Sequence, residues 1–275
     1  MNRKMRSRVY NIVVILVMLI ISVLFLMPYV GMILNSFKHK TEIMKGRTFW
    51  PQKFIIDNYI TVYEGAPIVQ WFWNSLFVSV VGTVLVLITS SLCGFVFGKY
   101  EFKGKQAMFL FVLATMMIPS SVTMIPSFLL IDGLGMYDNL LSLIIPGMVG
   151  GFGIFLCKQF IEDIPTALIE AAYIDGASDM YIYANIVIPL IKPALGALTI
   201  FTFLGKWNDY VGPLLYLSDP KRMTMPLALS YFTGQRANDF GAVMAAAVLI
   251  SLPVTIVYLC LQKQFVKGIA ITGMK

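Results

Sequence analysis

The sequence predicts an all-α membrane protein that crosses the bilayer several times. Of its 275 residues, 58% are hydrophobic and only 13% are charged, and the mean hydropathy is +0.79. These values are typical of multi-span membrane proteins and not of soluble domains. The apolar residues also fall in long runs without charges, several of which approach the ~20 residues that a spanning helix needs.

Six spans are expected, which makes residues 1–275 a single transmembrane domain. Their approximate ranges are 10–34, 71–98, 107–131, 140–158, 184–205 and 240–262. The first follows a basic segment and has no small-residue cleavage pattern, so we expect an uncleaved span and not a signal peptide. The fifth is interrupted by Lys192, whose side chain can reach the headgroups from near a helix end.

The distribution of positive charge predicts that both termini lie in the cytoplasm. An even number of spans places the termini on one side. With that side inside, twelve of the 21 Lys and Arg residues fall in the inner segments, which are also the shorter ones. Since positive residues favour the cytoplasmic side, the segment 162–183 between the fourth and fifth spans is expected to be cytoplasmic.

This segment predicts two short helices joined by a sharp turn, which we call the elbow (residues 162–183). Pro165 suits the first turn of a helix, where its missing N–H costs nothing. Gly176 can end that helix by adopting a positive φ, and Ser178 can cap a second helix that continues toward Ile186. An elbow between two spans is suited to docking on another protein. A plain interfacial helix hairpin is the alternative.

Prolines within the spans predict bends. Pro119 and Pro126 are about two turns apart and are expected to bend the third span from nearly the same face. The bend could serve as a hinge for gating, or it could be a static kink whose freed carbonyls are satisfied by neighbouring helices.

Several function classes are disfavoured. No acidic residue lies in the middle of a span, which argues against ion-coupled transport. No G-x-x-x-x-G-K-[ST] loop is present, so no nucleotide cofactor is expected and the driving energy must come from outside this chain. Gly150–Gly153 instead indicates close helix packing. The net charge of +7 is scattered without a basic face, which argues against nucleic-acid binding.

Catalysis is also not expected, because the chain lacks the residues that an intramembrane enzyme would need. Its single histidine, His39, stands between Lys38 and Lys40, and no motif for a nucleophile with a base or for a metal site occurs. The three cysteines, Cys93, Cys157 and Cys260, lie in apolar runs without metal-like spacing, so they are interpreted as packing residues.

The elbow carries a resemblance to a known family. Glu170-Ala171-Ala172, then three residues, Gly176, nine residues and Ile186-Val187-Ile188-Pro189 resembles the coupling loop of permease subunits of ATP-binding-cassette (ABC) importers. Ile188 stands where the family usually has Leu. The resemblance implies that the loop sits in a cleft of a separate ATP-hydrolysing subunit. It also implies coupling roles for Glu170, Ala171, Ala172, Asp175, Gly176, Ile186 and Pro189.

Other motifs are similar to those of carbohydrate permeases, especially the six-span partner of the maltose-type pair, within the binding-protein-dependent transport inner membrane component family. They are Pro28, Ser36-Phe37-Lys38, Pro126, Asp138-Asn139, Pro146, Lys158-Gln159-Phe160, Ile164-Pro165, Trp207-Asn208, Gln264-Phe265-Val266-Lys267-Gly268 and Gly273. The resemblance implies a type I ABC importer permease fold in which a short cytoplasmic helix couples to the ATPase. It implies a pathway shared with a second, non-identical permease subunit, two ATPase subunits that bind ATP, and an extracytoplasmic solute-binding protein.

The resemblance to carbohydrate permeases implies a sugar as the solute, with a polyol or a phosphorylated glycerol as alternatives. Trp207, Asn208 and Tyr210 combine aromatic rings with polar groups and could contact a sugar. The same residue types equally form an interfacial aromatic belt. The resemblance also implies that the loop after Trp207 faces the binding protein and that the tail Lys263–Lys275 lies against the ATPase subunits.

Overall fold

The computed structural model describes residues 3–46, 48–235 and 238–272, with side chains between residues 10 and 259. All regular structure within these residues is helical, as the sequence predicts. The chain divides into two compact units, each treated by itself below. Unit 1 comprises residues 1–68 and 229–252, and unit 2 comprises residues 69–228 and 253–275.

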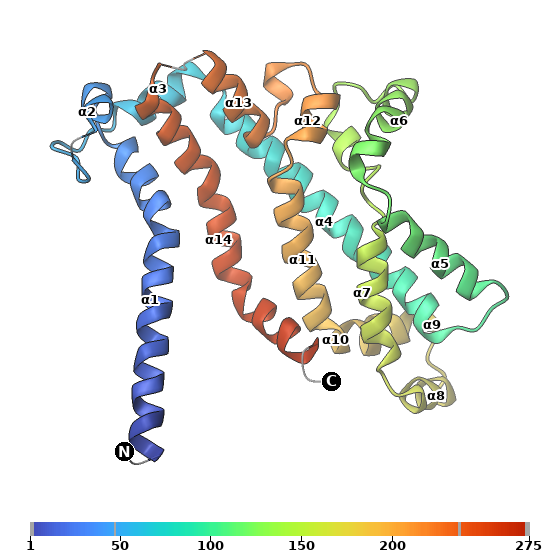
Figure 1. Cartoon of the computed structure of the whole chain (residues 1–275). Helices are drawn as coiled ribbons and strands as arrows, with labels where there is room; N and C mark the ends of the chain where they lie inside the picture. The colour runs from blue at the N-terminus through green and yellow to red at the C-terminus, as the bar shows by residue number, and fades with distance from the viewer. Residues whose placement is uncertain (1–2, 47, 236–237, 273–275) are drawn as a thin grey trace. The chain divides into compact units, whose positions relative to one another are not determined.

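The helices in chain order are as follows (Figure 1). They are α1 (Arg3–Ser36), α2 (Lys40–Lys45), α3 (Asp57–Gly65), α4 (Ile68–Lys99), α5 (Lys105–Met116), α6 (Ser120–Gly133), the 3₁₀ turn η1 (Leu140–Leu143), α7 (Gly151–Glu162), α8 (Thr166–Ile174), α9 (Asp179–Ile182), the π-helical turn η2 (Tyr183–Val187), α10 (Ile188–Leu190), α11 (Lys192–Trp207), α12 (Val211–Tyr216), the 3₁₀ turn η3 (Pro220–Arg222), α13 (Met225–Gln235) and α14 (Phe240–Thr272).

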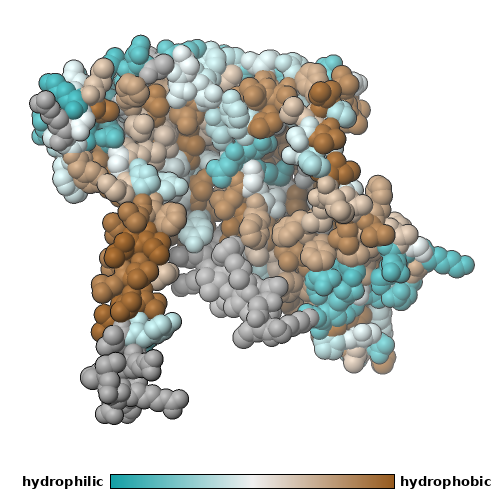
Figure 2. Space-filling view, viewed as in Figure 1, coloured by the Kyte–Doolittle hydropathy of each residue, from teal (hydrophilic) through white to brown (hydrophobic). Residues whose placement is uncertain are grey.

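Among the residues that the structure describes, three single helices are long and apolar enough to span a membrane. They cover Tyr10–Ser36, Ile68–Lys99 and Phe240–Leu259 and agree with the first, second and sixth predicted spans. Figure 2 shows that the described side chains of α1 are mostly apolar, and they are exposed, as expected of a helix that faces lipid or another protein. The structure therefore supports three spans directly, and up to five if each of two bent helix pairs is one span.

The third predicted span is one of these bent pairs. Helices α5 and α6 meet at an angle of 99° across residues 117–119. Pro119 stands immediately before α6, and a proline disfavours helical geometry in the residue that precedes it. Pro126 lies inside α6 without ending it. The break therefore occurs at the first of the two predicted prolines.

The fourth predicted span, 140–158, does not form one helix. It is divided into η1, an irregular stretch and the 12-residue helix α7. Non-helical backbone is tolerated at membrane depth only where its polar groups are satisfied by protein. Here the Thr89 hydroxyl donates to the Met148 carbonyl at 2.6 Å, and the Lys206 ammonium donates to the Leu143 carbonyl at 3.3 Å.

The core of unit 2 joins the elbow to the long helices. It contains Val86, Phe95, Cys157, Ile161, Ile164, Ile169, Ala172, Ile182, Val187, Ile191, Ala194 and Leu198. Glycines let α4 and α7 approach closely. A Cβ on Gly94 would lie 2.6 Å from Cys157 Cβ, and one on Gly153 would lie 2.2 Å from Ser90 Oγ. The predicted packing role of the glycine cluster is confirmed for Gly153.

Unit 1 is held together around Asn58 on α3. The Asn58 amide donates to the carbonyls of Ser36 and Lys38 at 2.8 and 2.9 Å, which ties α3 to the end of α1. The start of α14 packs on the same side chain, because a Cβ on Gly241 would lie 2.5 Å from Asn58 Oδ1. Asn58 therefore links three segments of unit 1 that are distant in the sequence.

Candidate functional site

The elbow is two short helices joined by a left-handed glycine, as predicted. Helix α8 ends before Gly176, whose φ is +81°. The Ala177 N–H donates to the Ala172 carbonyl at 2.9 Å and the Gly176 N–H to the Tyr173 carbonyl at 3.0 Å. These two bonds form the Schellman motif, which closes a helix with glycine in this conformation. The Ser178 hydroxyl then accepts from the Tyr181 N–H and caps α9, which confirms the predicted cap.

Helix α8 has one face on the core of unit 2 and one face open. Ile169 and Ala172 are buried in the core cluster, while Glu170 and Ala171 are exposed. The small side chain of Ala172 thus allows close packing on this chain itself, whereas Ala171 is the alanine available to another protein. Asp175 is exposed where α8 ends.

Ile174 is a further residue of the open face that sequence reasoning missed. Its side chain is 86% exposed, although isoleucine is usually buried in proteins. It follows the buried pair Ile169 and Ala172 by five and two positions, which turns it away from the core face of a helix. That offset is the signal that could have identified it.

The segment after the elbow is a bent connection into α11. The η2 turn ends with the Ile188 N–H bonded to the Tyr183 carbonyl, five residues back. Pro189 has no N–H to continue the ordinary helical pattern, which favours a π-helical turn before it. Helices α9–α10 and α11 then meet at 78° around Ile191. Ile186 is half-buried against the core cluster and Pro189 is exposed.

Tyrosine hydroxyls tie the elbow to the end of α4. The Tyr173 hydroxyl donates to the Asp179 carboxylate across the glycine turn, and this bond raises the pKa of Tyr173. Tyr100, which follows α4, lies with its hydroxyl 3.1 Å from that of Tyr173. The elbow is therefore fixed both within itself and to the segment after α4.

The predicted solute residues lie where α11 ends and α12 begins, at the end of unit 2 opposite the elbow (Figure 1). They differ in exposure, so they do not form one site. Trp207 is completely buried, stacks on Phe203 with ring centroids 5.7 Å apart and meets Phe72 edge-on. It is not an exposed aromatic residue available to a sugar. Asn208 is exposed at the end of α11, and Tyr210 is exposed before α12.

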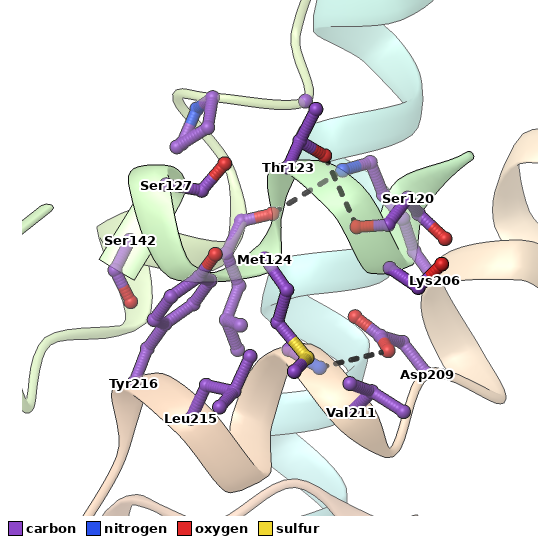
Figure 3. Close-up of a pocket in the computed structure, with 15 residues that line it drawn as sticks. Ser120, Thr123, Met124, Ser127, Ser142, Lys206, Asp209, Val211, Leu215 and Tyr216 are labelled. Atoms are coloured by element: carbon purple, nitrogen blue, oxygen red, sulfur yellow. Dashed lines mark hydrogen bonds between the residues drawn. The ribbon is translucent and has the colours of Figure 1, made fainter. Parts of the chain in front are cut away.

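A cavity of about 570 Å³, lined by apolar side chains and several polar groups, lies beside these residues (Figure 3). Helix α6, η1 and α12 form its walls, and the residues flanking the Trp207-Asn208 pair reach it, namely Lys206 and Asp209. Neither is among the solute residues predicted from the sequence, which are Trp207, Asn208 and Tyr210. The charges of Lys206 and Asp209 at the end of an apolar run were the available signal, since ionisable groups near membrane depth commonly mark functional sites.

Comparison with known proteins identifies the family. Residues 90–271 match the family described as binding-protein-dependent transport system inner membrane component. The chain belongs to this family. The matched range of this chain runs from the second half of α4 into α14 and includes both the elbow and the cavity.

Named relatives match this chain over nearly its whole length. It is 34% identical over 271 residues to the arabinooligosaccharides transport system permease protein AraQ of Bacillus subtilis, covering 97% of this chain and 96% of that relative. It is 29% identical over 269 residues to the lactose transport system permease protein LacG of Rhizobium radiobacter, covering 98% of each.

A solved structure resembles the permease in fold. It is a chain of a bacterial ABC transporter involved in the import of the acidic polysaccharide alginate. The TM-score is 0.84 at 26% identity, and the match covers 96% of this chain and 99% of that chain. The type I permease fold expected from the sequence is therefore supported by family and by structure.

Proposed function

We propose that this chain is the membrane-spanning permease subunit of an ABC importer that takes up a sugar or oligosaccharide. The solute would be delivered by an extracytoplasmic binding protein, and separate subunits would bind and hydrolyse ATP. The similarity to permeases for arabinooligosaccharides and lactose, over more than nine-tenths of the chain, supports a sugar as the solute. The family description supports dependence on a binding protein.

The observation that carries the coupling role is the open face of the elbow. Glu170 forms no hydrogen bond or ion pair with any described residue, and Ile174 beside it is almost fully exposed. A charged and an apolar side chain on a helix fixed by a Schellman turn are suited to a protein partner. Since this chain has no phosphate-binding loop, the partner with the complementary function is an ATPase subunit.

The proposed assembly contains two permease subunits, two ATPase subunits and the binding protein. The second permease would be homologous but not identical, which makes a heterodimer. We further propose six spans in the cell membrane with both termini in the cytoplasm. The three long helices and two bent pairs would provide five spans, and the sixth would combine α7 with the irregular stretch before it.

Coupling would follow the connected helices. Motion of the elbow would pass through α9 and α10 to α11, whose 16 residues measure roughly 24 Å at ~1.5 Å per residue. Because α11 ends at Lys206 and Trp207, this single rod would transmit motion from the ATPase side to the cavity at its other end. Access to the pathway would then alternate across the bilayer.

A crosslinking experiment on the assembled importer tests the coupling role. Ile174→Cys should form crosslinks to an ATPase subunit, because its side chain leads away from the core. Leu134→Cys is the matched control, since Leu134 is also an exposed apolar residue but lies in the loop after α6. Crosslinks to an ATPase from residue 134 and none from residue 174 would contradict the proposed orientation.

An uptake assay tests the solute class. Importer assembled with its partner subunits should accumulate radiolabelled oligosaccharides from a panel and hydrolyse ATP as it does so. Uptake of a polyol or glycerol phosphate in place of every sugar would favour that alternative. The purified single chain should show no enzymatic turnover of these compounds, and turnover by the chain alone would favour an intramembrane enzyme.

A further inference from the structure

The Lys206 side chain runs through a narrow passage beside Gly82 and Gly147, where a larger residue at either position would crowd it. A Cβ on Gly82 of α4 would lie 2.5 Å from Lys206 Cε, and one on Gly147 would lie 3.2 Å from Lys206 Nζ. The passage leads the ammonium group from the last turn of α11 to the wall of the cavity, where it donates to the Leu143 carbonyl at 3.3 Å. An ammonium has three N–H donors, so this bond uses one of them.

Asp209 brings a negative charge to the same cavity (Figure 3). Its Oδ1 atom accepts from the Gly212 N–H at 3.1 Å, and its carboxylate interacts electrostatically with Lys206. The Oδ2 atom accepts no hydrogen bond from a described residue and lies over Gly212, where a Cβ would come within 2.5 Å of it. The other described residues that line the cavity are uncharged, so the two charges together leave it neutral.

Hydroxyl groups complete the lining. Ser120, Thr123 and Ser127 reach the cavity from α6, Ser142 from η1 and Tyr216 from α12. The Ser142 hydroxyl donates to the Asn139 carbonyl at 2.7 Å, and the Thr123 hydroxyl donates to the Ser120 carbonyl at 3.1 Å. Ser127 is half-buried, and its hydroxyl bonds to no described residue. It is therefore free to bond to a molecule in the cavity.

A purely structural role explains only part of this arrangement. The bond from Lys206 to the Leu143 carbonyl would stabilise the irregular stretch after η1. It does not require a carboxylate beside the ammonium, nor hydroxyls from two further elements around about 570 Å³ of open space. That volume is within the ~300–1,000 Å³ typical of ligand sites, and a few convergent polar groups in a largely apolar pocket are their usual lining.

We propose that this cavity is a solute subsite within this subunit and that it holds one neutral sugar unit. Lys206 donates to a sugar oxygen, Asp209 Oδ2 accepts from a sugar hydroxyl, and Ser127 contributes a bond of either kind. Because the two charges balance, the subsite discriminates against a sugar acid, whose carboxylate would face Asp209. This inference rests on the proposed function and specifies where and how the solute is held.

Uptake kinetics in the assembled importer test the subsite. Ser127→Ala should raise the apparent KM for a neutral oligosaccharide about fivefold with little change in maximal rate, since one hydrogen bond is lost. Thr199→Val is the matched control. Thr199 is a half-buried hydroxyl residue on α11 whose bond goes to the Leu195 carbonyl and which does not line the cavity. The control should keep the original KM.

Charge variants test the selectivity. Asp209→Asn leaves Lys206 uncompensated, so uptake of a uronate-containing oligosaccharide relative to a neutral one should rise about tenfold. Lys206→Gln should lower that ratio. Should Lys206→Gln fail to fold because its bond to Leu143 is lost, Asp209→Asn and Ser127→Ala still decide the question.

The outcomes separate the two proposals. Sugar uptake by the original importer together with unchanged kinetics in Ser127→Ala and an unchanged acid-to-neutral ratio in Asp209→Asn would overturn the subsite and leave the proposed function standing. An importer that takes up no sugar of the panel would overturn the proposed function. The subsite is supported only when the KM of Ser127→Ala and the ratio of Asp209→Asn both change as described.

Discussion

The hydroxyl oxygens of Ser91 and Tyr183 lie 2.7 Å apart, which joins the C-terminal third of α4 to the π-helical turn η2 that leads from the elbow toward α11. Ser91 directs its own proton to the Leu87 carbonyl at 2.6 Å, so Tyr183 is the donor in this contact. The Tyr183 ring also packs on Phe95, with centroids 5.8 Å apart. The contact fixes the segment through which movement of the elbow would reach α11.

Tyr183→Phe should remove this bond and keep the ring packing. We expect a loss of about 1 kcal/mol in stability, the usual value for one hydrogen bond. The coupling of ATP hydrolysis to uptake should also fall, because the turn is less firmly held to α4. Thermal unfolding in detergent and uptake per ATP hydrolysed measure the two effects. A double-mutant cycle with Ser91→Ala is the control, and a coupling energy near zero would contradict the role of this bond.

Gly176→Val should abolish uptake and stimulation of the ATPase while membrane insertion stays intact. The space around Gly176 is open, so the cost comes from its φ of +81°, which a β-branched residue does not readily adopt. Gly176→Asn should retain much of the activity, since asparagine tolerates this conformation. Gly31→Ala in α1 has equal space without the positive φ and is the control. Normal uptake by Gly176→Val would refute the elbow role.

Gly153 and Gly150 should respond very differently to the same substitution. Gly153→Ala places a methyl group 2.2 Å from Ser90 Oγ, and relieving that overlap should cost about 1–3 kcal/mol. Gly150→Ala meets no described atom within 4 Å and should change stability by less than about 1 kcal/mol. Melting temperatures of the two variants measure the difference. Equal values would show that α4 and α7 are not packed at Gly153 as described.

Asp138 should give the loops at the cavity end of unit 2 a pH-dependent stability. Burial opposes ionisation, but the backbone N–H groups of Ser218 and Asp219, at 3.0 and 3.1 Å, and Arg222 at 3.3 Å hold the pKa of Asp138 below its ordinary value of 3.8. A lowered pKa means that the stabilisation is complete above the ordinary value and is lost as the pH falls through the folded-state value.

Asp138→Asn is the variant that isolates this charge. Asparagine tolerates the φ of 55° at this position and can still accept the two backbone bonds. We expect it to cost about 1 kcal/mol near neutral pH, a modest value because the ion pair is partly exposed. The difference from the original protein should shrink below about pH 4. Unfolding measured across pH 3–7 checks this, and a constant difference would contradict it.

The elbow was predictable because its determinants are local. A glycine that tolerates positive φ and a serine that bonds an N–H three residues on act over a few residues of backbone, whatever surrounds them. The single-helix spans were predictable for a similar reason. In the bilayer, the backbone N–H and C=O groups of a long apolar run must bond to each other, and a helix lets them do so within the run itself.

The cavity was not predictable in the same way. Lys206 and Asp209 are three residues apart, but their role depends on Gly82 and Gly147 leaving room for a lysine and on α6 supplying hydroxyls across the gap. Trp207 looks like an exposed aromatic residue in the sequence, yet Phe72 and Phe203 enclose it. Exposure of a side chain is a property of what packs around it, and residues distant in the sequence decide that.

The sequence by itself determined a helical membrane chain, the family to which it belongs, and an elbow with a glycine at its turn. Only the tertiary structure decided that 140–158 is divided, that Ala172 faces this chain's own core, and that Lys206 and Asp209 meet at a cavity. The physical reason is the range of the interactions. Hydropathy and backbone conformation are set within a few turns of chain, whereas packing and the pairing of charges depend on segments that only folding brings together.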